Sequence, residues 1–387
     1  MLGQQYGLTP EQESLKELVA DLVARHVAPR AAEIDRTGEF PQDVYAVLRD
    51  HELLGLGVPE AYGGSGLGVI SVCLAIEQVA RACASSSLIL AVQELGLLPI
   101  LVGGSEEQKR RWLPPIARGQ VLCSFGLTEP ESGSDAGAMK TRAVRDGNHY
   151  VLGGQKRFIT GASVSGLFTV FAVTDPAAGQ RGTSCFVVEQ GTPGFRIGRH
   201  EEKMGIRGSP TCELIFEDCR VPAENLIGKE GDGFKIALIT LDQSRPGVAA
   251  QALGIADGAL SFAMDYIKER KQFGQRIADF QGIQFMVADM ATKVEAARLL
   301  VYRSAALIDA QGPVRGRLPV DINKLSAMAK MYASDTAMSV TTDAVQLLGG
   351  YGYIKEYPVE RMMRDAKITQ IYEGTNQIQR LVIARAL

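Results

Sequence analysis

The order of hydrophobic patterns along the chain constrains its fold more than any single motif. Apolar residues recur at helical spacing in residues 1–120, give way to short β-branched runs in residues 121–225, and return to helical spacing in residues 226–387. A doubly wound nucleotide-binding fold would instead alternate strands and helices. We therefore predict an α+β protein with an N-terminal α-helical domain, a central antiparallel β domain and a C-terminal helical bundle.

Local signals support this division. Thr9 and Pro10, followed by acidic residues, predict the start of the first helix, and Ser105 with Gln108 forms a capping box before a later one. An apolar stripe from Ile283 to Ile308 is typical of a helical bundle. Further helices are predicted at residues 70–84, 85–102 and 320–348. Strand-like runs separated by glycine and proline turns lie at residues 143–152, 167–174, 184–189 and 211–217.

Composition excludes several classes of function. The chain has 387 residues, 46% of them hydrophobic, which is enough for two or three domains with a large core. A net charge of -3 does not indicate a nucleic-acid surface. The chain contains no uninterrupted run of 18 apolar residues, so we expect no membrane span.

The use of cysteine and histidine argues against a metal site. The six cysteines are scattered without a Cys-x-x-Cys pair, and the four histidines lack the spacing of metal ligands. We expect the cysteines to be core residues in a reducing compartment. Residues 1–10 show neither a signal peptide nor a transit peptide, so we expect a cytoplasmic, bacterial-type location.

The segment Ile371–Arg380 carries the strongest candidate for catalysis. Glu373 lies between an aromatic residue and Gly374, which has no side chain and leaves room for a ligand beside the backbone. Thr375 or Asn376 can cap the helix that follows. Burial of such a carboxylate beside an apolar ring would raise its pKa toward the range useful for a general base. The alternative is an exposed carboxylate at an ordinary helix start.

Further segments combine glycine, hydroxyl or charged residues in ways that suit a bound ligand. Taken alone, each also fits an ordinary structural role: a surface turn, a strand core, a charged helix face or a helix that ends at glycine. Asp242 and Arg245 are three residues apart on a predicted helix and can pair on one face, and Pro246 is expected to kink or break that helix. The segments are Phe125–Gly137, Lys156–Ala162, Leu241–Pro246, Glu269–Gly274, Phe280–Gln284 and Gln346–Gly352.

Together with Ile371–Arg380, these segments resemble acyl-CoA dehydrogenases, in the same order and over nearly the whole chain, from Thr9 to Arg385. The resemblance implies the fold of that family, with a four-helix bundle at the C-terminus, and FAD as the cofactor. It also implies oxidation of an acyl-CoA to the trans-2-enoyl-CoA, in which Glu373 removes the α-proton and flavin N5 accepts a hydride. Ser244 stands where some relatives carry their base, which leaves Glu373 as the matching candidate.

The resemblance also implies the other residues of the site. Phe158 and Gly161 depart from the family, in which tryptophan and asparagine are common, but an aromatic ring can still cover the flavin. Donors at Leu127 and Thr128 would face the flavin pyrimidine edge, and Arg270 would reach the pyrophosphate from a neighbouring subunit. The expected FAD contacts are Phe125, Leu127, Thr128, Gly133, Ser134, Phe158, Ile159, Thr160, Arg270, Gln272, Phe273, Gln281, Gln346, Leu347, Gly349, Gly350, Thr375 and Gln377. The expected substrate contacts are Ser134, Asp242, Arg245, Tyr372 and Gly374.

Partners and alternative functions follow from the same resemblance. We expect an electron-transfer flavoprotein as electron acceptor, a homotetramer, and a role in fatty acid β-oxidation with short or medium acyl chains. One alternative is an oxygen-using flavoenzyme of this fold, such as an N-hydroxylase or a nitroalkane oxidase, but those enzymes usually alter the base that Glu373 supplies. Another is a non-catalytic partner that binds flavin or acyl-CoA, and the intact base argues against it.

Overall fold

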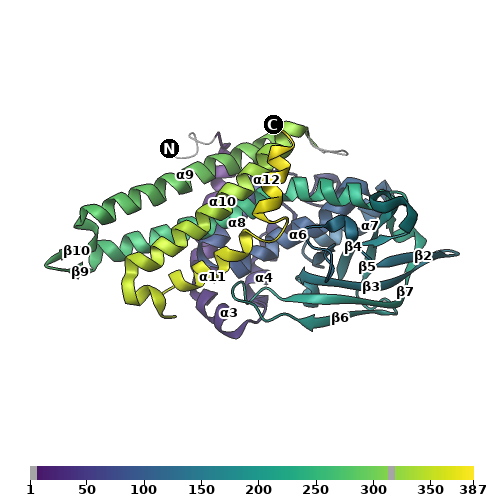
Figure 1. The fold of residues 1–387 in the computed structure, drawn as a ribbon, viewed down its shortest axis with the longest axis horizontal. Coiled ribbons are helices and arrows are strands. Elements are labelled where there is room, and N and C mark those ends of the chain that lie inside the picture. Colours follow the sequence, from purple (N-terminus) through teal and green to yellow (C-terminus); the bar gives the residue numbers. More distant parts are fainter. Residues whose placement is uncertain (1–6, 313–318) are drawn as a thin grey trace.

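The computed structural model describes residues 7–312 and 319–387, so the expectation about a leader in residues 1–10 lies largely outside the described residues. Helices come first, a β-sheet follows and helices return, as the ribbon shows (Figure 1). This arrangement confirms the predicted α+β architecture. One hydrophobic core includes residues of two N-terminal helices and of several strands, so residues far apart in the sequence meet between the helices and the sheet.

The N-terminal helices begin where the sequence places capping residues. Thr9 Oγ1 accepts from the N–H of Gln12 at 3.3 Å, and the N–H of Thr9 donates to Gln12 Oε1 at 3.0 Å. Ser105 and Gln108 form the same two bonds at 3.2 and 2.9 Å. These bonds satisfy amide groups that the first helical turn leaves open, which confirms both predicted starts. The helices are α2 (Pro10–Leu22), α3 (Ala31–Thr37), α4 (Gln42–Asp50), α5 (Gly68–Ala82), α6 (Ala84–Gly103) and α7 (Glu106–Ala117).

The central domain is built on an eight-stranded sheet in the order β6-β7-β3-β2-β4-β5-β8, with β1 paired to β4. Most pairs are antiparallel, but β1 and β2 each run parallel to β4, so the prediction of an antiparallel domain is wrong for these two pairs. Hydrophobic alternation does not encode the direction of a neighbouring strand, and a long connection between β1 and β4 permits the parallel pairing. The strands are β1 (Cys123–Gly126), β2 (Arg142–Asp146), β3 (His149–Thr160), β4 (Leu167–Val173), β5 (Thr183–Glu189), β6 (Phe195–His200), β7 (Thr211–Pro222) and β8 (Leu226–Ile227).

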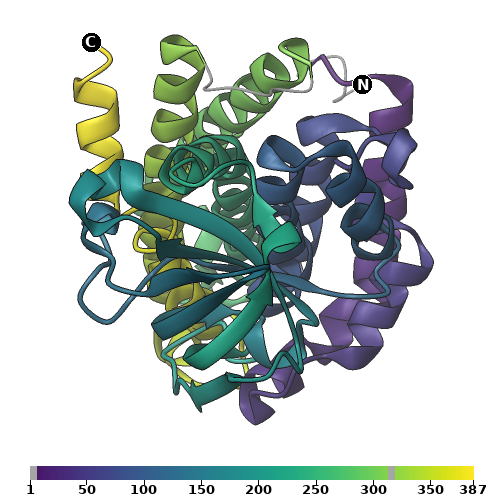
Figure 2. The ribbon, with the colours of Figure 1, turned by 90° about the vertical axis from the view of Figure 1, so that its right-hand side faces the viewer.

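Strand β4 is buried on both faces of the sheet. Phe168 and Val170 pack into one core, and Leu167 and Phe171 pack into another on the opposite face. The core around Phe171 also includes residues of α6, of α7 and of the start of α8 (Gly233–Glu269). Helices therefore cover this face of the sheet (Figure 2). Alternate side chains of a strand point to opposite faces, which explains why this strand is a continuous apolar run.

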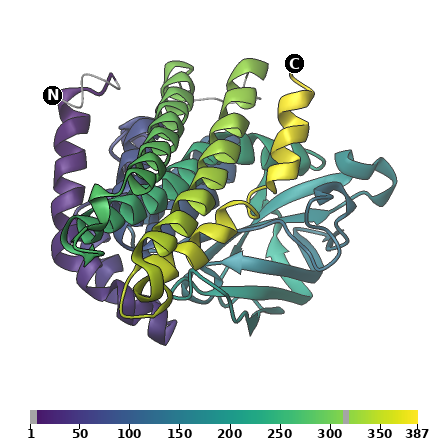
Figure 3. The ribbon, with the colours of Figure 1, turned by 60° about the vertical axis from the view of Figure 1, so that its left-hand side comes forward.

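The C-terminal region is a bundle of long helices. Helices α8, α9 and α10 pack against one another, and α5 packs on α8 (Figure 3). Helix α8 continues through Pro246 without interruption, so the break considered from the sequence does not occur. A hairpin of β9 (Lys271–Gln272) and β10 (Gln275–Arg276) lies at the end of the molecule opposite the sheet (Figure 1). The helices are α8 (Gly233–Glu269), α9 (Gln281–Ala310), α10 (Val320–Leu348), α11 (Val359–Thr369) and α12 (Asn376–Ala384).

The structure bears on three expectations from composition: the absence of a membrane span, the place of the cysteines and the absence of a metal site. Helices α6 and α8 are long and apolar enough to cross a membrane by length and composition alone, but most of each apolar stretch is buried inside the protein, as in core helices. The six cysteines are unpaired and buried, which confirms their predicted place in the core. Within residues 7–312 and 319–387, no group of three or more His, Cys, Asp or Glu residues is arranged to hold a metal ion.

Candidate active site

Glu373 lies in a tight turn between α11 and α12. Glu373 and Gly374 both have positive φ angles, 52° and 91°, and a Cβ atom at Gly374 would lie 2.8 Å from Gln379 Nε2. That nitrogen donates to the carbonyl oxygens of Glu373 and Gly374 at 3.1 and 3.0 Å. Thr375 Oγ1 accepts from the N–H of Ile378 at 3.3 Å and caps α12, as predicted. The turn requires glycine after the glutamate and holds the glutamate in a backbone conformation that such residues rarely adopt.

The Glu373 carboxylate faces α8 rather than open solvent. Ser244 Oγ donates to Glu373 Oε2 at 2.5 Å. Burial raises the pKa of Glu373, while the Ser244 hydroxyl and the positive charges of Lys330 and Arg245 act in the opposite direction. The direction of the shift agrees with the expectation from the sequence. Glu373 is partly buried and bonded to Ser244, so it is not the exposed carboxylate of the alternative. A raised pKa makes the carboxylate a better proton acceptor near neutral pH.

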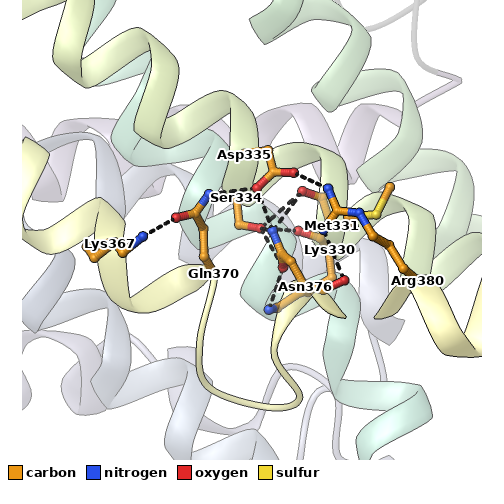
Figure 4. A network of polar contacts seen from close by, with 8 residues as sticks. All are labelled: Lys330, Met331, Ser334, Asp335, Lys367, Gln370, Asn376 and Arg380. Carbon is orange, nitrogen blue, oxygen red and sulfur yellow. Dashed lines mark hydrogen bonds and ion pairs between the residues drawn. The ribbon is translucent and has the colours of Figure 1, made fainter. Parts of the chain in front are cut away.

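Lys330 on α10 anchors the turn. Its ammonium group donates to the carbonyl oxygen of Gly374 at 2.8 Å and to Asn376 Oδ1 at 3.0 Å. Asn376 Nδ2 and Gln370 Nε2 both donate to Asp335 Oδ1, at 2.7 and 2.6 Å (Figure 4). Burial lowers the pKa of Lys330 to about 7. The two ends of the turn are therefore tied to one helix, which fixes the place of the carboxylate between them.

Glu373 also borders a cavity between three helices, here called the inner hollow. Helices α5, α6 and α8 supply the rest of its wall, in which aliphatic side chains and a glycine face four polar side chains. A carboxylate of raised pKa beside such a cavity is suited to take a proton from carbon once a bound substrate fills the cavity and displaces water. The lining residues are Val69, Val72, Ile76, Ala91, Glu94, Gln243, Ser244, Gly247, Val248 and Glu373.

Two of the predicted substrate residues form a buried ion pair on α8. Arg245 Nη1 lies 2.7 Å from Asp242 Oδ1, which confirms the pairing predicted from their spacing. Arg245 Nε has no hydrogen-bond partner among residues 7–312 and 319–387. Tyr372 donates its hydroxyl to Gln251 on the same helix. These contacts join the turn to α8 through a second set of side chains.

The predicted flavin loop after β1 is held by a buried ion pair. Lys156 Nζ lies 2.7 Å from Glu129 Oε1 and donates to the carbonyl oxygen of Leu127 at 3.0 Å. The N–H of Arg157 donates to the carbonyl oxygen of Thr128 at 2.8 Å. Lys156 is fully buried and Glu129 nearly so, which excludes a simple surface turn at this point. Strand β3 therefore fixes the backbone at Leu127 and Thr128.

Phe158 interrupts the regular pairing of β3. The register with β7 shifts between Lys156 and Ile159, and Phe158 has a φ of 59° and a side chain 56% exposed. Ile159 is buried, so the strand-core interpretation is correct for Ile159 and wrong for Phe158, because the irregularity turns the ring outward. An exposed ring on a constrained backbone is suited to stacking on a flat ligand. The nearby candidates Phe125 and Thr160 are partly buried, and Gly133 and Ser134 are exposed.

Other predicted FAD residues gather in a second cavity of about 590 Å³, here called the distal hollow. The Arg270 guanidinium lies over the ring of Tyr351, 5.2 Å from its centre. Arg270 is 25 residues after Arg245 at the end of the same helix, or about 37 Å away. The hairpin that follows it lies opposite the sheet (Figure 1). Within one chain, the distal hollow therefore lies far from both Glu373 and the flavin loop. The predicted residues that line the distal hollow are Arg270, Gln272, Gln346, Leu347, Gly349 and Gly350.

The remaining candidates lie outside both hollows. Phe273 and Gln281 are exposed, on the hairpin and at the start of α9. Thr375 and Gln377 lie at the start of α12, beside the Glu373 turn.

Sequence reasoning missed two residues of this site, Glu94 and Lys330. Glu94 is the one charged residue in α6, and Lys330 stands in a stripe of buried alanines on α10. A charged residue within an apolar run or on the alanine-rich face of a helix is seldom placed there without a reason, and this signal could have found both.

Comparisons with known proteins cover nearly the whole chain. Three family models match in order: acyl-CoA dehydrogenase, N-terminal domain, at residues 9–120; middle domain, at 124–219; and C-terminal domain, at 231–387. The chain is 50% identical to a probable acyl-CoA dehydrogenase, FadE25, of Mycobacterium tuberculosis, over 99% of this chain and 96% of that protein. A chain in a solved structure of the electron transferring flavoprotein of Acidaminococcus fermentans is 50% identical, with a TM-score of 0.94 and 98% of both chains covered. Butyryl-CoA dehydrogenase from Megasphaera elsdenii is 45% identical, with a TM-score of 0.93 over 98% of both chains.

Proposed function

The chain belongs to the acyl-CoA dehydrogenase family of FAD-dependent oxidoreductases, and we propose that Glu373 is the base that removes the α-proton of its acyl-CoA substrate. One observation carries the proposal: the Glu373 carboxylate, whose pKa burial raises, borders the inner hollow, where aliphatic side chains of three helices lie beside it. The product is the trans-2-enoyl-CoA. FAD, when bound, supplies the acceptor for the hydride that leaves the β-carbon, at flavin N5.

The chain's own groups support proton transfer at Glu373. The Ser244 hydroxyl orients the carboxylate through one oxygen, which leaves the other oxygen for the α-proton. None of the hydrogen bonds within residues 7–312 and 319–387 uses the N–H of Glu373. That N–H is available to the thioester carbonyl, where it would stabilise the negative charge that develops as the proton leaves. Lys330 keeps the turn in place through Gly374.

The residues present fit FAD at two places. Phe158 offers an exposed ring for the flavin, beside the fixed backbone of Leu127 and Thr128. Arg270 offers a cation and several donors for the pyrophosphate, at the edge of the distal hollow. Because one chain holds these two places at opposite ends, we propose that a second copy of the chain completes each FAD site. This arrangement supports an oligomer in which neighbouring subunits complete each other's sites, and we propose the homotetramer that the family resemblance implies.

The partners are proposed from the relatives. The likeness to a chain in the electron transferring flavoprotein structure supports such a flavoprotein as the electron acceptor. The likeness to butyryl-CoA dehydrogenase supports a short acyl chain and a role in β-oxidation. We propose a cytoplasmic location.

The test follows flavin absorbance under anaerobic conditions. Purified holoenzyme is mixed with butyryl-, octanoyl-, palmitoyl-, isobutyryl- and 2-methylbutyryl-CoA. Wild type is compared with Glu373→Gln and with Glu17→Gln, which changes an exposed carboxylate on α2. We expect at least one thioester to bleach the wild-type flavin, Glu17→Gln to match wild type, and Glu373→Gln to bleach about 10³-fold more slowly with its FAD content unchanged.

Two results would contradict the proposal. Bleaching of Glu373→Gln at the wild-type rate would exclude Glu373 as the base. Failure of every thioester to bleach the wild-type flavin, with oxygen consumption on another substrate, would favour the oxygen-using alternative.

A further inference from the structure

Glu94 on α6 shares the inner hollow with Glu373. It is the one charged residue in a helix that is otherwise mostly apolar, from Ala84 to Gly103. The hollow around it is lined largely by aliphatic side chains: Val69, Val72, Ile76, Ala91 and Val248. A second carboxylate is therefore built into the wall of an apolar cavity that already contains the proposed base.

The Glu94 carboxylate has no hydrogen bond or ion pair to any residue in 7–312 or 319–387. Both of its oxygens would lie 3.1 Å from a Cβ atom at Gly57, so the absence of a side chain there makes room for them. Asp309, the charged group that acts on it, has the same sign and accepts from the N–H groups of Val69 and Ile70 at 2.6 and 3.0 Å. Burial, and to a lesser extent Asp309, raises the pKa of Glu94 to about 7.

Such a group is costly for a protein to keep without a use. Glu94 is partly buried, and a carboxylate that is partly removed from water without a hydrogen-bond partner in the protein loses part of its solvation. Proton abstraction at Glu373 does not require Glu94, since the Glu373 carboxylate has its own donor in Ser244. A donor supplied by a ligand in the hollow would satisfy Glu94.

We propose that Glu94 is a specificity-determining residue that accepts a hydrogen bond from a hydroxyl or ammonium group on the acyl chain of the substrate. This inference rests on the proposed function, because it takes the inner hollow to hold the acyl chain. A chain that ends in a methyl group would leave the carboxylate desolvated and unpaired. A chain that ends in a carboxylate would meet a like charge. An unpaired or repelled carboxylate in the complex weakens substrate binding by roughly tenfold to hundredfold.

The test compares paired substrates on the holoenzyme at pH 8, where Glu94 is mostly ionised. Butyryl-, valeryl-, hexanoyl- and octanoyl-CoA are each compared with the thioester that carries a hydroxyl on its last carbon, and glutaryl-CoA is included. The measurement is kcat/KM with an artificial electron acceptor, for wild type, Glu94→Leu, Glu94→Gln and the control Glu17→Gln. FAD content and Tm report whether each variant folds.

We expect wild type and Glu17→Gln to prefer the hydroxylated thioester at least tenfold at one chain length. Glu94→Leu should reverse this preference and have a higher kcat/KM than wild type with the unsubstituted thioester. A merely structural role of Glu94 would not produce opposite changes for the two substrates. Glu94→Gln, which keeps one acceptor oxygen, should retain part of the preference and use glutaryl-CoA better than wild type. If Glu94→Leu does not fold, the comparison of Glu94→Gln with wild type on glutaryl-CoA is sufficient to test the inference.

Other outcomes overturn the inference. If wild type oxidises the unsubstituted thioesters and shows no preference at any chain length, or if the Glu94 variants keep its preference, the role of Glu94 is wrong while the proposed function holds. If no thioester is oxidised by wild type, the proposed function fails first, and the inference fails with it.

Discussion

The buried pair of Lys156 and Glu129 allows a sharp test of how the flavin loop is held. Lys156→Met removes the cation and also the donor to the Leu127 carbonyl oxygen. Glu129 would then stay buried as an unpaired anion, with the backbone N–H groups of Lys140 and Thr141 still donating to it. Burial lowers the pKa of Lys156 to about 8, which shows that the environment penalises the lone charge.

The size of the effect follows from the burial of both groups. Breaking a buried pair by removing one partner costs about 3–5 kcal/mol. An entropy of unfolding of roughly 2.1 cal/mol/K per residue gives about 0.8 kcal/mol/K for a chain of 387 residues. If the chain unfolds as one unit, the expected loss in Tm for Lys156→Met is therefore about 4–6 °C. We also expect loss of FAD, because the loop at Leu127 and Thr128 loses its anchor.

Thermal unfolding of the purified holoenzyme, with FAD content measured in parallel, provides the assay. Lys140→Met is the matched control, because Lys140 pairs with Glu131 on the surface and exposed pairs contribute about 0–1 kcal/mol. The double variant Glu129→Gln with Lys156→Met removes both charges and should recover at least half of the lost stability. The reasoning is refuted if Lys156→Met melts within 1 °C of Lys140→Met and keeps its FAD.

Three further predictions concern groups that border the inner hollow or the turn beside it. Ser244→Ala removes a donor to Glu373 and so raises the pKa of that carboxyl further. The acid limb of the kcat/KM profile should move to higher pH, with up to about a tenfold loss of kcat/KM on that limb, and an unmoved limb would contradict this. Lys330→Met removes a positive charge near Glu373 and the donor to Gly374; the same limb should move in the same direction and kcat should fall roughly tenfold, whereas a change in FAD content alone would argue for a purely structural role. Burial raises the pKa of Glu94 from 4.5 in the unfolded chain to about 7, so its ionisation removes stability as pH rises through that window, up to about 3 kcal/mol above pH 7. Glu94→Gln should therefore melt a few degrees above wild type at pH 8 and close to it at pH 5, and an equal difference at both pH values would show that ionisation is not the cause.

Some parts of the fold and of the site were readable from the sequence because they depend on neighbours along the chain. The bonds of Thr9 and Ser105 at helix starts, and the Asp242–Arg245 pair, join residues only three positions apart. The Thr375 cap is equally local. Local spacing determines such contacts, since a helix always brings positions three apart to one face.

Other parts depend on packing between segments that are far apart in the chain. The β1–β4 pairing is parallel, although both strands read as ordinary strands, because pattern carries no information on direction. Phe158 is exposed because a register shift in the pairing with β7 turns it outward, which no propensity indicates. Lys330 and Glu94 gain their roles only from what the bundle places opposite them.

The sequence by itself determined the α, β, α order, the main helix starts, the family, and the glutamate that we propose as the base. Periodicity and short-range spacing record which face of each element is buried, and they are sufficient for those conclusions. Only the tertiary structure decided what surrounds that glutamate: the Ser244 hydroxyl, the Lys330 ammonium, and a second carboxylate at Glu94 in the same hollow. The pKa of a buried group depends on all the charges and dipoles within a few ångströms, and the fold brings those together from four separate segments of the chain.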